Sequence, residues 1–139
     1  MKKLFMTIIL LVISLLCSCS VIPENDAKSF ASEYLELLEN ADFTSLEERS
    51  GFIQTDNIEE KFNNLEKDTG VDFQSGIEVQ TCEVTHSTHS DSYYGCPLTE
   101  VAMWITVGDA NTELIMHIIS EDGDLKVAKF DINTHYSIA

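Results

Sequence analysis

The stretch LTEVAMWITVGDANTELIMHIIS, residues 98–120, decides the fold of this chain. It contains two runs rich in apolar and β-branched residues, 98–107 and 112–120, separated by the turn sequence GDAN at 108–111. Such runs on either side of a short turn containing Gly, Asp and Asn are typical of a β-hairpin. We therefore expect two antiparallel strands at the centre of a sheet.

Two further runs flank this hairpin. Residues 77–86 are rich in Val and Thr, and residues 125–135 follow EDGD at 121–124, the clearest hairpin turn in the chain. The four runs are joined by short turns and one longer loop, which predicts an antiparallel sheet.

The central strands carry apolar residues on both of their faces. Val101, Met103 and Ile105 alternate with Ala102 and Trp104. One face is expected to pack on helices, whereas the other lines a pocket, forms a homodimer interface or wraps tightly on the core. The pattern does not separate these alternatives. A tryptophan on a central strand is more often a core residue than a ligand contact, so we expect Trp104 in the core.

Three helices are expected before the strands. Apolar residues recur at spacings of three and four over 27–38 and again over 58–65, with a short helix between them. The expected boundary residues are Asp26 as the N-cap of the first helix, Thr44 and Glu47 as a capping box for the second, Thr55 or Asp56 as the N-cap of the third, and Gly70 at its end. Helices followed by a four-stranded meander predict a single α+β domain over 26–139.

This order of elements resembles the nuclear transport factor 2-like (cystatin-like) superfamily. The phrase FASEYLELLENADFTSLEE, residues 30–48, is similar to the opening of many small bacterial lipoproteins with that fold. The resemblance implies N-terminal helices packed on a strongly bent, cone-shaped sheet whose other face serves as a pocket or a dimer interface. Enzymes of the superfamily use Asp and His inside the cone, but no position here matches such a motif.

The N-terminus has the pattern of an export signal. Lys2 and Lys3 precede a mostly apolar run over 4–16, which is too short to span a bilayer as a helix of ~20 residues and suits a signal peptide. LLCSCS at 15–20 closes that run, and Leu16-Cys17-Ser18-Cys19 resembles the bacterial lipobox. The resemblance implies cleavage after Ser18 and acylation of Cys19.

This reading divides the chain into a lipoprotein signal peptide at 1–18, a lipidated tether at 19–25 and the domain. The acyl chains on Cys19 are the only covalent group that we expect, and they anchor the protein in the cell membrane or the outer membrane. Ser20 stands where an Asp would resemble an inner-membrane retention signal, which favours the outer membrane in a host that has one. Fully extended, the tether spans ~20 Å, so the domain lies close to the membrane surface.

The composition is strongly acidic, with 24 Asp and Glu against 8 Lys and Arg and a formal charge of −16. Removing the signal peptide takes away two lysines and no acidic residue, so the charge becomes −18. Such a surface repels nucleic acid and anionic headgroups, and we exclude nucleic-acid binding. The acidity serves either solubility or the recognition of a basic protein partner.

Two cysteines remain in the domain, Cys82 and Cys96. An even pair in an exported protein predicts a disulfide. The loop that it would close, of about 15 residues, corresponds to ~3 kcal/mol of stability on the chain-entropy account.

The same loop, CEVTHSTHSDSYYGC at 82–96, holds the candidate site residues. His86, His89 and Asp91 provide imidazole and carboxylate groups that suit Zn²⁺, Cu²⁺ or Ni²⁺. A structural zinc site uses four ligands, and the alternative is a polar loop without a metal. Tyr93 and Tyr94 are candidates for an interaction patch, because tyrosine is enriched at protein interfaces.

Motifs of the common enzyme classes are absent. There is no glycine-rich phosphate loop, no nucleophile elbow and no His-Glu-x-x-His run. His117 fits either a core histidine or the base of a pocket. We expect a non-enzymatic envelope lipoprotein that binds a protein or a small ligand near the membrane. The alternatives are an acidic inhibitor or immunity-type protein against a cationic partner, and a metal-handling lipoprotein that uses His86 and His89.

Overall fold

The computed structural model describes residues 21–51, 57–90 and 97–133. In that part of the chain the elements are α2 (Glu24–Glu39), α3 (Phe43–Glu48), α4 (Ile58–Thr69), the 3₁₀ turn η2 (Phe73–Ser75), β1 (Ile77–Ser90), β2 (Pro97–Val107), β3 (Ala110–Glu121) and β4 (Asp124–Asn133). The strands form one antiparallel sheet in the order β1-β2-β3-β4. The predicted α+β class and four-stranded meander are confirmed.

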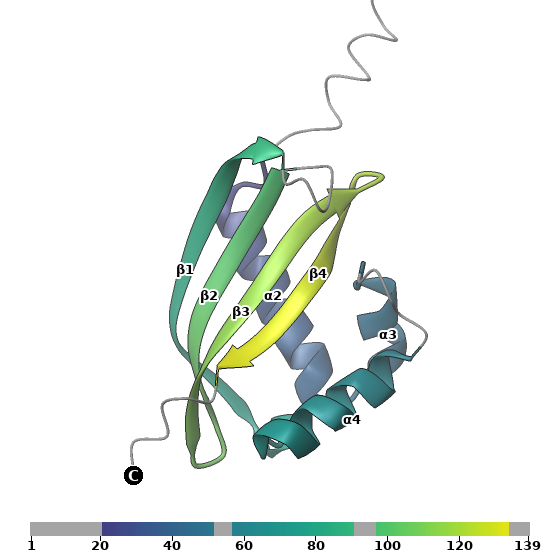
Figure 1. Ribbon diagram of the computed structural model, residues 1–139, viewed down its shortest axis with the longest axis vertical. Helices are drawn as coiled ribbons and strands as arrows, with labels where there is room; N and C mark the ends of the chain where they lie inside the picture. The colour runs from purple at the N-terminus through teal and green to yellow at the C-terminus, as the bar shows by residue number, and fades with distance from the viewer. Residues whose placement is uncertain (1–20, 52–56, 91–96, 134–139) are drawn as a thin grey trace, which may run out of the picture.

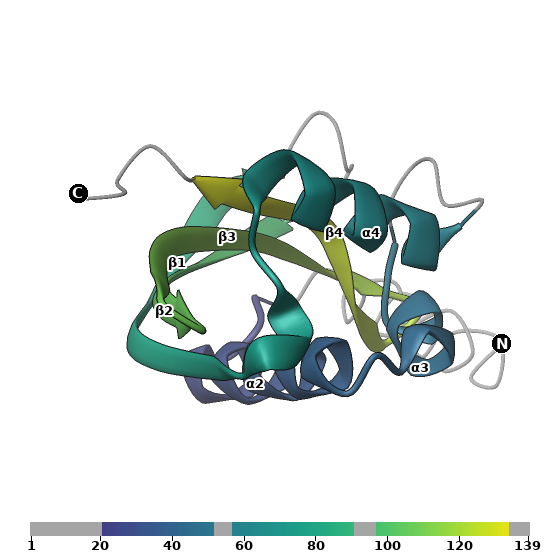
Figure 2. The ribbon, with the colours of Figure 1, turned by 90° about the horizontal axis from the view of Figure 1, so that it is seen from below.

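The helices lie on one side of the sheet. Helix α2 runs along the face that points away from the viewer in Figure 1. The sheet bends over α2, and α4 lies toward the β4 edge (Figure 2). The inward side chains of β2 and β3, among them Met103 and Leu114, are buried together with the apolar side of α2. The other face of the sheet is not covered by any described element.

An aromatic cluster fills the interior where these layers meet. It consists of Tyr34 on α2, Phe62 on α4, Phe73 on η2 and Phe130 on β4. The Phe62 ring packs edge-on against Phe130 at a centroid distance of 5.1 Å and against Phe73 at 6.2 Å. Tyr34 lies 6.2 Å from Phe130. Edge-to-face packing is favourable beyond the area that it buries, so this cluster joins three helical segments to the last strand.

The hydroxyl of Tyr34 is bonded inside this core. Ser50 Oγ donates to the Leu46 carbonyl oxygen at 2.6 Å, so its single proton is used. The Tyr34 hydroxyl is therefore the donor in its 2.7 Å bond to Ser50 Oγ. Burial raises the pKa of Tyr34 well above its usual value, although the bond to Ser50 opposes this rise. The protonated phenol thus ties α2 to the segment after α3.

That segment is also paired with β4. The Val127 N–H donates to the Arg49 carbonyl at 2.9 Å, and the Gly51 N–H donates to the Val127 carbonyl at the same distance. A Cβ on Gly51 would lie 3.1 Å from Lys126 Cβ, so the close approach favours glycine. On its other edge, β4 pairs with β3, where His117 lies opposite Lys129 and Ile118 lies opposite Val127. Ala128 between them has no partner in the ladder and forms a β-bulge.

Two of the predicted helix caps are wrong. Helix α2 begins at Glu24, directly after Pro23, and Asp26 lies inside its first turn. Helix α3 is capped by Asp42 rather than by Thr44 with Glu47. The Asp42 carboxylate accepts from Ser45 N at 3.2 Å and from Ser45 Oγ at 2.7 Å. Asp42 takes this position because α2 ends through Ala41 at φ 53°, so that α3 starts at once.

The third helix begins at a different residue from those predicted. Asn57 caps α4 by accepting from Glu60 N at 3.1 Å, and the candidates Thr55 and Asp56 lie outside the described residues. Gly70 ends α4 in the left-handed conformation at φ 72°, as predicted. Strand β1 extends beyond the predicted 77–86, because Ser90 still pairs with Pro97.

The aromatic cluster provides a test of the core. Replacing Phe62, which is buried, with Ala removes three ring contacts, and we expect the free energy of unfolding to fall by ~3–5 kcal/mol in urea denaturation. Glu59→Ala, on the exposed side of the same helix, is the matched control and should stay within ~0.5 kcal/mol. Equal effects of the two changes would contradict this packing.

The Asp42 cap predicts a pH-dependent contribution to stability. Hydrogen bonds from the Ser45 side chain and backbone lower the pKa of Asp42 below its usual value of 3.8. Because the folded-state pKa is the lower one, the stabilisation is present above pH ~4 and is lost as the pH falls through the folded-state pKa. Asp42→Ala should therefore be less stable than wild type at pH 7 in urea denaturation, and the difference should shrink in acid. Thr44→Ala, the rejected cap, should show no such pH-dependent difference.

Candidate functional site

The uncovered side of the sheet carries the candidate site. Along β2, Val101, Met103 and Ile105 are buried on the helix side, whereas Trp104 between them is 41% exposed. The prediction that Trp104 lies in the core is therefore wrong. Its side chain points away from α2, because neighbouring residues of a strand face opposite sides of the sheet. We call this side, centred on Ala102, Trp104 and Ile115, the Trp104 face.

The centre of the Trp104 face is a small apolar patch. Ala102 lies directly opposite Ile115 in the ladder, and Trp104 lies opposite Glu113. On the neighbouring strand, Glu83 lies opposite Ala102. Residues directly opposite in an antiparallel ladder share a face and lie side by side. An aromatic and two aliphatic side chains are thus bordered by carboxylates.

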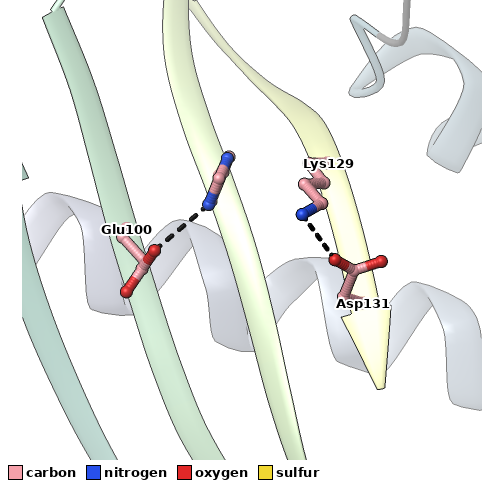
Figure 3. A network of polar contacts seen from close by, with 4 residues as sticks. Glu100, Lys129 and Asp131 are labelled. Atoms are coloured by element: carbon pink, nitrogen blue, oxygen red, sulfur yellow. Dashed lines mark hydrogen bonds and ion pairs between the residues drawn. The ribbon is translucent and has the colours of Figure 1, made fainter. Parts of the chain in front are cut away.

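Two polar pairs lie on the same face, and one of them includes Asp131, which lies directly opposite Ile115. Glu100 Oε2 is 3.1 Å from His117 Nε2 across β2 and β3, and Lys129 Nζ is 2.6 Å from Asp131 Oδ2 on β4. Figure 3 shows Glu100, Lys129 and Asp131 on the side of the sheet away from the helix behind it. His117, considered as a core residue or a pocket base, has a mostly buried side chain (16% exposed) and forms a cross-strand pair with Glu100 (42% exposed). Carboxylates outnumber cations on this face, so it is negatively charged.

The Glu100–His117 pair was not predicted from the sequence. A two-residue turn at Gly108 and Asp109 makes Val107 pair with Ala110. Antiparallel counting outward from that pair places Glu100 opposite His117. The turn predicted over 108–111 would instead pair Val107 with Thr112 and place Glu100 opposite Ile119, so the contact follows only once the turn is known to be two residues long.

The predicted metal ligands are only partly described. His86 Nδ1 lies 3.2 Å from Thr99 Oγ1. His89 lies in strand β1, but its side chain is outside the described part of the structure. Asp91 lies outside the described residues altogether. Within the described ranges, no group of three or more His, Cys, Asp or Glu side chains could hold a metal ion. Tyr93 and Tyr94 also lie outside the described residues, so both site predictions stay predictions.

Cys82 is a free cysteine in the structure, and Cys96 lies outside the described residues. Cys82 pairs with Met103 in the ladder, and Met103 is six residues along β2 from Pro97. A Cys82–Cys96 bond stays a prediction, because Cys96 lies outside the described residues.

Two open hollows lie on the surface of the described part. A hollow of about 510 Å³ between α2, α3 and the β3–β4 turn includes Phe30, Glu33, Arg49 and Lys126. Arg49 lies 5.7 Å above the Phe30 ring and 2.7 Å from Glu33, and Lys126 donates to the Glu48 carbonyl oxygen. A hollow of about 300 Å³ lies near Ser75 and Gly108. Both are polar and shallow, unlike the enclosed apolar cavities that hold small ligands.

A comparison with known protein families, curated proteins and solved structures found no match to this chain. The resemblances to the lipobox and to the nuclear transport factor 2-like superfamily therefore stay predictions. Cys19 lies outside the described residues. No helix among the residues that the structure describes has the length and apolar character needed to cross a membrane.

The state of Cys82 is open to direct measurement. Burial raises the pKa of the Cys82 thiol, which lowers its thiolate fraction and its reactivity. Because the thiol is partly buried, we expect a free Cys82 to be alkylated by iodoacetamide slowly in the folded protein and rapidly in urea, and equal rates would contradict this burial. Peptide mass spectrometry under non-reducing conditions shows whether the thiol is free. A Cys82 peptide linked to Cys96 would confirm the predicted disulfide.

Proposed function

We propose that this chain is a non-enzymatic envelope lipoprotein, anchored through Cys19, whose domain binds a protein partner through the Trp104 face. The observation that carries this proposal is the exposure of Trp104 at the centre of a sheet face that no described element covers. Tryptophan is enriched among the residues that dominate binding energy at protein interfaces.

The filled interior favours a protein over a small apolar ligand. The aromatic rings of Phe62, Phe73 and Phe130 occupy the space between the helices and the sheet. The two hollows are polar and open. An open sheet face with a large aromatic side chain and charged neighbours suits a protein surface better than a drug-sized molecule.

The carboxylates around Trp104 favour a second candidate, an acidic inhibitor of a cationic protein. Glu113 lies directly across the ladder from Trp104, and Glu83 borders the same patch. An arginine or lysine of a partner that stacks on the indole would come within reach of these carboxylates. Both candidate functions use the Trp104 face as the contact surface. They differ in how much of the binding free energy comes from charge.

Capture from the native envelope tests the proposal. We expect crosslinking of the lipidated protein to yield one stoichiometric partner by mass spectrometry, and Trp104→Ala to lower its recovery at least tenfold, about 1.4 kcal/mol. Val79→Ala is the matched control: Val79 is 40% exposed and pairs with the buried Ile105, so it lies on the other face.

The salt dependence of the capture separates the two candidates. Loss of the partner at high ionic strength favours the acidic inhibitor, because salt screens exposed charges. Equal recovery with Trp104→Ala and with Val79→Ala would show that the Trp104 face is not the contact surface.

A further inference from the structure

The folded domain begins closer to the expected anchor than the sequence suggested. Ile22 is only 5% exposed and belongs to the buried cluster, whereas Val21 before it is exposed. The chain is therefore fixed at Ile22, three residues after Cys19. At ~3.6 Å per residue, about 11 Å of chain separates Ile22 from the acylated residue.

Ile22 lies on the helix side of the sheet, and this limits how the anchored domain can be oriented on the membrane. Helix α2 starts at the end of the sheet where Ser90 pairs with Pro97, and it lies behind the sheet in Figure 1. Helix α2 also contacts β1, the strand that ends at Ser90. The chain thus enters the domain in the helix layer, opposite the Trp104 face.

Two factors keep the Trp104 face off a lipid surface. If this face lay on the membrane, the anchored chain would have to pass from the helix layer to the far side of the sheet, and packed layers are ~10 Å apart. That path would use nearly all of the ~11 Å between Ile22 and the acylated residue. In addition, Glu83, Glu100 and Glu113 lie on this face, and anionic headgroups repel them.

We propose that the short connection pinned at Ile22 turns the Trp104 face away from the lipid and presents it to a basic surface of a neighbouring protein. This inference rests on the proposed lipid anchor at Cys19. The occupant is basic because the carboxylates that border Trp104 outnumber the cations of the face. Lipid headgroups are the alternative occupant, and the test distinguishes the two.

Trp104 is the only tryptophan in the chain, so its emission reports on this face alone. The lipidated full chain, with acylation of Cys19 verified by intact mass, is inserted into vesicles of phosphatidylethanolamine and phosphatidylglycerol that contain doxyl-labelled lipid. We expect no loss of Trp104 emission relative to vesicles without the label, and unchanged quenching by soluble acrylamide. Loss of emission to the doxyl lipid would show that the face lies on the membrane and would overturn the proposal.

A relocated tryptophan provides the matched control. In the double variant Val21→Trp with Trp104→Phe, the indole lies next to the anchor, and the doxyl lipid should quench it strongly. Absence of acylation, or of quenching in this variant, would refute the lipid anchor and with it the proposed function. Quenching of both proteins would leave the anchor intact and refute the orientation.

The basic character of the partner is tested with a lysine-rich peptide in vesicles of phosphatidylethanolamine and phosphatidylcholine, because the peptide would itself bind anionic phosphatidylglycerol. We expect the peptide to shift Trp104 emission saturably, and high salt to reverse the shift. Glu113→Gln should weaken the apparent affinity several-fold, whereas Glu36→Gln, exposed on α2, should leave it unchanged. No shift, or the same affinity for both variants, would overturn the assignment of a basic partner.

Discussion

The edge-on contact between Phe62 of α4 and Phe130 of β4 is the interaction on which the rest of the structure depends. It closes the interior at the β4 edge and brings Phe73 and Tyr34 into the same cluster. A sheet that bends over helices leaves a hollow unless large side chains occupy it, and here aromatic rings do so. These rings fill the interior between the helices and the sheet, which is why the proposed contact surface lies on the outside of the sheet.

The strands and their order could be predicted because their signals are local. Alternation along 98–107 and the turn sequences at 108–111 and 121–124 depend only on neighbouring residues, and the structure reproduces both hairpins. The left-handed end of α4 at Gly70 was predictable for the same reason. The helix caps were harder to predict. Asp42 and Thr44 are both good capping residues, and the way α2 ends at Ala41 decides between them.

The candidate site was predictable only in part. The sequence shows that Ala102 and Trp104 face the side opposite Val101 and Met103, but it does not show which element covers that side. Burial of a second sheet face depends on tertiary packing, and here the helices all contribute to the first face. Trp104 was therefore assigned to the core by residue type, whereas the structure leaves it on the surface.

The pairing of Arg49 and Gly51 with Val127 has a consequence for self-association. Open-ended growth of a sheet needs two edges with unpaired backbone groups, one on each side of every copy. Both backbone groups of Val127 on the outer edge of β4 are already used within the chain, and the bulge at Ala128 bends the strand next to them. The β4 edge is thus unsuited to a second strand, which removes one of the two surfaces that fibrillar stacking would require.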